Sequence, residues 1–125
     1  MNGRRYLIDT HILIWALNQS ETLPPRYSDL LAREDECVVS IISIWEIAIK
    51  KGLGKLHIGD NFADVIVRTG VAVLPITLKH IAEYETLPYH HRDPFDRMLI
   101  AQARAEKLSV LTVDRNFALY DVTVA

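Results

Sequence analysis

The segment YLIDTHILIWAL, residues 6–17, decides the fold class. Its first part, Tyr6–Ile8, is a short continuous apolar run, which is typical of a strand buried on both faces. Asp9 follows directly, and Ile12–Leu17 then continues as an apolar segment with the pattern of a buried helix. The segment therefore predicts a strand that leads into a helix, with a carboxylate at the junction.

The same alternation of short apolar runs and helical patterns continues along the chain. Further strands are expected at Cys37–Val39, Val71–Pro75, Val110–Val113 and Val122–Val124. Further helices are expected at Pro25–Arg33, Ile41–Lys51, Phe62–Arg68, Leu78–Thr86 and Pro94–Lys107. Because strands and helices alternate without an obvious hairpin signal, we predict an α/β fold with three layers, α/β/α, around a mainly parallel central sheet.

Length and composition limit the class of protein. A chain of 125 residues has room for one compact domain, so we expect a single domain over residues 1–125. The 14 basic and 16 acidic residues give a net charge of -2, which excludes a strongly basic protein that coats nucleic acid. The single cysteine excludes an intramolecular disulfide, and no apolar run has the roughly 18 to 20 residues of a membrane-spanning helix. We expect a soluble, cytoplasmic protein.

Two acidic residues directly follow predicted strands. Asp9 comes after Tyr6–Ile8, and Asp114 comes after Val110–Val113. Ligands of open parallel sheets bind beyond the carboxyl ends of the strands, so both carboxylates are expected at the binding edge. Each also has a purely structural alternative, because Asp9 could cap the following helix and Asp114 could hold a turn.

A third acid lies in an unusually apolar helix. Within Ile41–Lys51 the polar exceptions include Ser43, Glu46 and Lys50, which fall on one stripe of the helix. Because the rest of the helix is apolar, we expect Glu46 to face a polar site, with Ser43 beside it. The alternative is a simple ion pair between Glu46 and Lys50, one turn apart.

The segment HHRDPFDRMLIA, residues 90–101, predicts the start of a helix. Asp93 has the position of a helix cap, Pro94 suits the first helical position, and Asp96 falls in the first turn. Capping requires only one of the two acids. We therefore take Asp96 as the third acid of the site and Asp93 as the cap, a supporting residue, or an alternative third acid.

Together these acids predict a metal site. Asp9, Glu46, Asp96 and Asp114 come from four separate elements, and unpaired carboxylates in one cleft would repel each other. A divalent cation removes this conflict, and oxygen ligands favour Mg²⁺ or Mn²⁺. Carboxylate-held cations of this kind assist attack on phosphodiesters.

In these motifs the chain resembles PIN-domain proteins, and more closely the VapC-type ribonuclease toxins of type II toxin–antitoxin pairs. The matching motifs are LIDTHILIWAL (7–17), VSIISIWEIAIK (39–50), HRDPFDRMLIAQA (91–103) and LTVD (111–114). The resemblance implies an endoribonuclease that depends on Mg²⁺ or Mn²⁺, with metal-binding, catalytic acids at Asp9, Glu46, Asp96 and Asp114. It also implies supporting hydroxyls at Thr10 and Thr112, a homodimer, and a small antitoxin that covers the acidic cleft.

An RNA substrate requires positive charge beside these acids. The candidate rim consists of Lys50, Lys51, Lys55, His91, Arg92 and Arg97. Such residues would contact phosphates without reading sequence. The lysines could equally be a solvated helix end. Trp15 and Trp45 are expected in the core, and Tyr84 and Tyr89 could either stack on bases or pack internally.

One other class of function stays open at this point. A PIN-like module that holds RNA or a protein without cutting would share the fold, because fold does not fix function. A phosphatase with an aspartyl nucleophile is disfavoured, since it usually needs a second acid two residues after Asp9, where this chain has His11. A receiver domain is disfavoured because it needs an acidic pair after the first strand.

Overall fold

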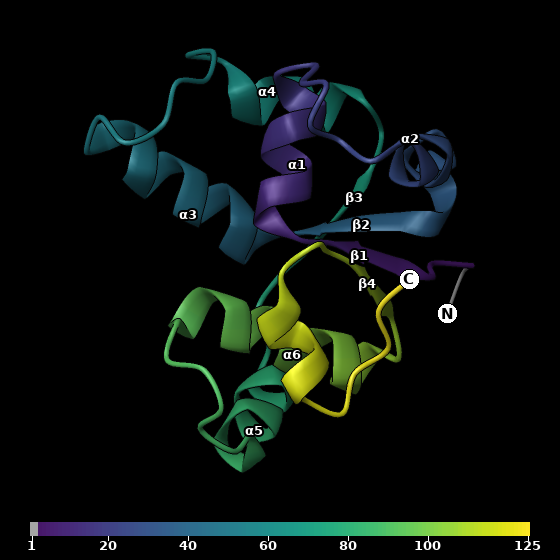
Figure 1. Ribbon diagram of the computed structural model, residues 1–125, viewed down its shortest axis with the longest axis vertical. Coiled ribbons are helices and arrows are strands. Elements are labelled where there is room, and N and C mark those ends of the chain that lie inside the picture. The colour runs from purple at the N-terminus through teal and green to yellow at the C-terminus, as the bar shows by residue number, and fades with distance from the viewer. Residues whose placement is uncertain (1–2) are drawn as a thin grey trace.

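A four-stranded sheet forms the middle layer of the computed structural model, which describes residues 3–125 (Figure 1). The strands are β1 (Tyr6–Ile8), β2 (Cys37–Ser40), β3 (Ala72–Leu74) and β4 (Ser109–Leu111). Their order is β3-β2-β1-β4, and every pairing between them is parallel. The predicted mainly parallel sheet is confirmed, with β1 in its interior.

Helices cover both faces of this sheet (Figure 1). They are α1 (Thr10–Leu17), α2 (Pro25–Leu31), α3 (Ile41–Gly52), α4 (Phe62–Arg68), α5 (Leu78–Thr86) and α6 (Pro94–Glu106), with short 3-10 helices at Glu34–Glu36 and Arg115–Leu119. The first four α-helices lie on one side of the sheet, whereas α5 and α6 lie on the other (Figure 1). The predicted three-layer α/β/α fold is therefore confirmed. No helix within residues 3–125 combines the length and apolarity that crossing a membrane requires.

Two hydrophobic cores fill the spaces between the layers. Leu7, Val38 and Val110 face the core with α6, and their neighbours Ile8, Val39 and Leu111 face the core with α1. Successive strand residues point to opposite faces, so a strand covered on both sides must be apolar throughout. This is why the strands read as continuous apolar runs.

The end of the chain departs from the prediction. Val122–Val124 is not a strand; it meets the sheet through one isolated bridge between Val110 and Val124. The hydrogen bonds there are made by Val110 alone, whose N–H donates to Thr123 O and whose carbonyl accepts from Ala125 N. Because the segment meets β4 at this one residue, it forms no ladder with the sheet.

Buried hydrogen bonds fasten α6 to the sheet edge where the predicted acids lie. The Ser40 hydroxyl, at the end of β2, donates to Gln102 Oε1 over 2.6 Å and accepts from Ile42 N at the start of α3. The Gln102 side chain in turn donates to Pro75 O over 3.3 Å. These bonds fix α6 relative to the β2–α3 junction.

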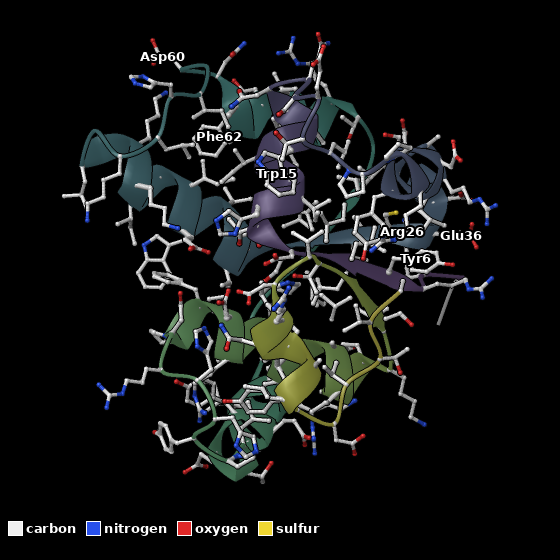
Figure 2. The ribbon with its side chains drawn as sticks, in the orientation of Figure 1. Tyr6, Trp15, Arg26, Glu36, Asp60 and Phe62 are labelled. Carbon is white, nitrogen blue, oxygen red and sulfur yellow. The ribbon has the colours of Figure 1, made fainter. Side chains whose placement is uncertain are left out.

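Tyr27 holds the chain that leads out of β4. Its buried hydroxyl lies 2.9 Å from Thr112 O and 2.7 Å from Ala125 O. Tyr27→Phe should lower the free energy of unfolding by about 1 to 2 kcal/mol, because a buried carbonyl loses its donor. Urea denaturation measures this change. Tyr6→Phe is the matched control: Tyr6 is half-buried at the start of β1 (Figure 2), and its substitution should cost less than about 0.5 kcal/mol.

Candidate metal centre

Asp9 is the innermost predicted acid. It follows β1, is buried, and caps α1 through a 2.8 Å hydrogen bond from Thr10 N to Oδ1. The Thr112 hydroxyl donates to the other oxygen over 2.9 Å. Burial raises the pKa of Asp9 to about 6 despite these two bonds, and the charges of Asp114 and Glu46 add to the rise. Asp9 therefore caps α1 and also lies within reach of other acidic charges.

Glu46 lies on the inner face of α3 and is only 2% exposed. Its Oε2 pairs with Lys50 Nζ at 2.9 Å, so the predicted ion pair exists, and it raises the pKa of Lys50. Its Oε1 is buried and has no hydrogen-bond partner within residues 3–125. A buried carboxylate oxygen without a partner is costly, so this oxygen is suited to bind a cation.

Asp96 comes from the first turn of α6 and is buried. Burial and the charge of Asp93 raise its pKa to about 7, although a hydrogen bond from His91 opposes the rise. Asp9 and Glu46 raise it further, which places Asp96 within electrostatic reach of both. The acid that follows β1 and the acids of α3 and α6 therefore lie within reach of one another's charges.

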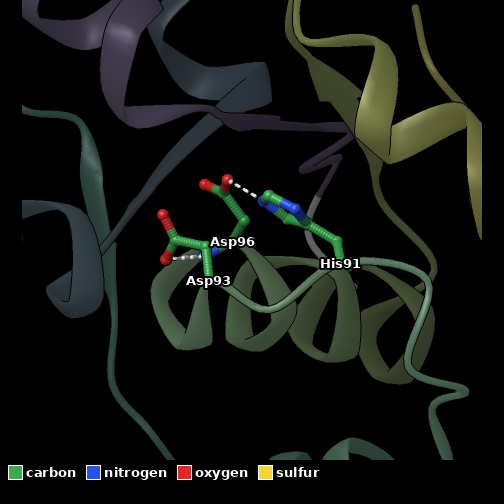
Figure 3. Close-up of side chains that lie close together, drawn as sticks. All are labelled: His91, Asp93 and Asp96. Carbon is green, nitrogen blue, oxygen red and sulfur yellow. Dashed lines mark hydrogen bonds and ion pairs between the residues drawn. The ribbon is translucent and has the colours of Figure 1, made fainter.

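Asp93 has a different role. Its Oδ1 accepts hydrogen bonds from Phe95 N at 2.8 Å and Asp96 N at 3.3 Å, so it caps α6 as expected (Figure 3). Asp114 likewise starts a 3-10 helix by accepting from Asn116 N at 2.9 Å. Asp114 is half-buried, and it is linked to Asp9 through Thr112, whose hydroxyl accepts from Asp114 N.

The supporting hydroxyls also lie where the sequence predicts them. Thr10 Oγ1 donates to Ser43 Oγ over 2.9 Å, and both residues are buried. This bond joins α1 to α3, the helices that follow Asp9 and carry Glu46. Thr112 completes the set through its contacts with Asp9 and Asp114.

The donor set fits a hard divalent cation. Ligand atoms of His91, Asp93 and Asp96 lie within 4.8 Å of one another, the only group of three or more this close among residues 3–125 (Figure 3). The four predicted acids are therefore more widely spaced. Carboxylate oxygens are the ligands that Mg²⁺ and Mn²⁺ prefer, and the predicted acids all offer them.

Comparison with known families decides where this arrangement belongs. The family model of the PIN domain matches residues 6–122. The chain belongs to the PIN domain family. No curated protein matches it.

Solved structures share the PIN fold at low sequence identity. VapBC2 of Rickettsia felis bound to promoter DNA is similar with a TM-score of 0.71 at 18% identity over 95% of each chain. DNA-bound VapBC of Salmonella typhimurium gives 0.74 at 14% identity, over 98% of this chain and 97% of that one. FitAcB of Neisseria gonorrhoeae gives 0.67 at 20% identity over 95% of each chain. These likenesses confirm the fold that the sequence motifs predict.

The predicted basic rim of this PIN domain is only partly a surface. Lys55 and Arg92 are exposed, whereas Lys50 pairs with Glu46 and Lys51 pairs with Asp60 at 2.8 Å. The prediction for Arg97 is wrong: it is 1% exposed. Its guanidinium turns into the protein, because it donates to backbone carbonyls and packs on the rings of Tyr84 and Tyr89.

Trp45 was expected in the core, and this is also wrong. It is 56% exposed, and its ring packs edge-on against Phe95 at the start of α6 with centroids 5.4 Å apart. Trp15 is partly buried on α1, packed against the core as expected (Figure 2). The pattern of α3 is apolar on nearly all sides, so it does not show which side is outside.

His91 and Tyr120 are connected in a way that the sequence does not reveal. His91 was expected on the rim, but its Nε2 lies 3.0 Å from Asp96 Oδ2 (Figure 3). Tyr120 was not singled out, yet its buried hydroxyl contacts both His91 N and Arg97. No local pattern signals Tyr120, because its partners are more than 20 residues away in sequence.

Proposed function

We propose that this PIN domain is a metal-dependent endoribonuclease, the toxin of a VapC-type toxin–antitoxin pair. The observation that carries the proposal is that three buried carboxylates, Asp9, Glu46 and Asp96, lie within reach of one another's charges, with Glu46 Oε1 unpaired. Such a cluster is unfavourable without a counter-charge. A bound divalent cation supplies that charge.

The acids that would hold Mg²⁺ or Mn²⁺ are Asp9, Glu46 and Asp96, with Asp114 at the edge of the group. When bound, such an ion lowers the pKa of water and stabilises the leaving oxygen of a phosphodiester. The chain itself orients the ligands: Thr10 N and Thr112 Oγ1 hold the two oxygens of Asp9, and Asp93 fixes the first turn that carries Asp96. Lys50 holds one oxygen of Glu46.

RNA would be held beside the acids by exposed cations. Arg92, which directly precedes Asp93, and Lys55, which follows α3, are the free members of the predicted rim. With so few phosphate contacts, binding should weaken only modestly as salt rises, since the salt dependence scales with the number of phosphates neutralised.

The partners follow from the same proposal. The similar solved structures are VapBC and FitAB complexes, several of them bound to DNA. We therefore expect a cognate antitoxin that covers the acidic cleft, a homodimer of this chain, and action in the cytoplasm on cellular RNA.

Cleavage of total cellular RNA tests the proposal directly. Discrete fragments are expected with Mn²⁺ or Mg²⁺, none with excess EDTA, and fragments again when the metal is restored, because the acids repel one another without a cation. The readout is gel electrophoresis and mapping of the fragment ends. An Asp9→Asn protein purified in the same way excludes a contaminating nuclease.

The opposite result has a defined meaning. If RNA stays intact in every lane while calorimetry shows that Mn²⁺ binds, the nuclease proposal is contradicted. The fold would then serve the alternative function, a module that binds RNA or protein without cutting.

A further inference from the structure

Arg97 is a buried cation without an acidic partner. It is 1% exposed, and no carboxylate within residues 3–125 lies at ion-pair distance from it. Its nitrogens donate to Pro88 O at 2.8 Å, Leu87 O at 3.4 Å and the Tyr120 hydroxyl at 3.1 Å. Burying a charge is costly unless the charged group is paired or hydrogen-bonded, so Arg97 depends on these three acceptors.

Most of these contacts are made with one loop, residues 87–91, which leads into α6. Arg97 binds the carbonyls at its beginning, and the guanidinium carbon lies 4.0 Å from the centre of the Tyr89 ring. Tyr120 binds the other end, where its hydroxyl oxygen accepts from His91 N at 3.0 Å. Arg97 therefore binds one end of the loop and Tyr120 binds the other, and the two side chains are hydrogen-bonded to each other.

The loop places the His91 side chain beside Asp96. His91 precedes the helix, so its 3.0 Å contact with Asp96 Oδ2 depends on the path of the loop rather than on helix geometry (Figure 3). When Asp96 is ionised its oxygen can only accept, so Nε2 is then the donor. The other oxygen of Asp96, Oδ1, is left for a cation.

We propose that His91 is a positioning residue for Asp96, held in place by Arg97 and Tyr120. The inference rests on the proposed function in taking Asp96 as a metal ligand. A hydrogen bond from His91 selects one orientation of the Asp96 carboxylate before the cation arrives. Partners that orient a metal ligand in this way typically change metal affinity by about 10- to 100-fold.

Calorimetric titration with Mn²⁺ alone tests this role without any RNA. His91→Ala should weaken Mn²⁺ binding at least about tenfold. His91→Gln should restore most of the affinity, because the Gln amide nitrogen can occupy the position of Nε2. His57→Ala, at an exposed histidine outside the loop, is the matched control and should bind like the wild type.

A second variant tests the path from Tyr120 to His91. Tyr120→Phe keeps the ring and removes only the hydroxyl, and it should weaken Mn²⁺ binding severalfold. If Tyr120 acts through His91, the double variant Tyr120→Phe/His91→Ala should bind no worse than His91→Ala alone. Additive losses would contradict the linkage.

Two results would overturn the proposal. One is equal Mn²⁺ affinity of the wild type and His91→Ala. The other is a directly bonded imidazole nitrogen in the electron spin echo spectrum of bound Mn²⁺, which would make His91 a ligand instead. A wild type that binds Mn²⁺ with the expected His91 dependence but cuts no RNA would overturn the nuclease proposal and support the positioning role.

Discussion

Asp9→Asn is expected to slow RNA cleavage by more than about a hundredfold, because loss of a residue that only orients a metal ligand already costs 10- to 100-fold. The substitution removes the charge and keeps the shape. Asn retains an acceptor for Thr10 N, which donates to Oδ1 of Asp9 over 2.8 Å, and the Thr112 hydroxyl can rotate to accept from the new amide. The fold should therefore survive while the metal centre fails.

The measurement is the initial cleavage rate at saturating Mn²⁺, together with the melting temperature of the metal-free protein. Asp29→Asn is the matched control, since Asp29 is an exposed acid on α2, which carries none of the site residues. It should cut RNA at the rate of the wild type. A folded Asp9→Asn protein with an unchanged rate and unchanged Mn²⁺ affinity would remove Asp9 from the site.

Without metal, the protein should become more stable as the pH falls from about 7.5 to 5. The pKa is raised to about 7 for Asp96 and about 6 for Asp9, so each carboxyl binds its proton more tightly in the folded than in the unfolded state. The stabilisation is complete below the ordinary pKa of 3.8 and is lost as the pH rises to about 7. Each pKa unit is worth about 1.4 kcal/mol, which predicts a gain on the order of 3 kcal/mol.

Urea denaturation in EDTA at several pH values measures this effect. Asp96→Asn isolates the contribution of this one carboxyl: it should flatten the pH dependence and raise the stability at pH 7.5. Saturating Mn²⁺ should stabilise the wild type most at high pH, where the carboxylates are charged. If the free energy of unfolding in EDTA has the same pH slope for the wild type and Asp96→Asn, burial does not raise the pKa of Asp96.

The sequence predicts where helices and strands lie along the chain better than it predicts which side of each helix faces the core. The β1–α1 junction is legible because one continuous apolar run, one acid and one helical pattern follow each other locally. Adjacent helix residues, however, point about 100° apart. Asp96 faces the acids while Arg97, next to it, faces the 87–91 loop.

Trp45 and Glu46, which are adjacent on α3, also differ in burial. Glu46 is buried and Trp45 is exposed, yet both stand in an almost uninterrupted apolar run that suits either orientation. The contacts of Tyr120 with His91 and Arg97 could not be predicted from a local sequence pattern. They join segments far apart in sequence, which only the folded chain brings together. Asp9 and Asp114 could be predicted because they follow strands, and Asp96 because it lies in the first turn of a helix. Glu46 could be predicted because it is a polar exception in an apolar helix.

The position of β1 inside the sheet sets the order in which a growing polypeptide can fold. β1 pairs with β2 on one side and with β4 (Ser109–Leu111) on the other, and Thr112, next to β4, donates to Asp9. A ribosome has therefore synthesised nearly all of this domain before its first strand finds its last neighbour. Non-local pairing of this kind folds slowly. Under the proposed function, an unfinished nascent chain is harmless to the cell that makes it.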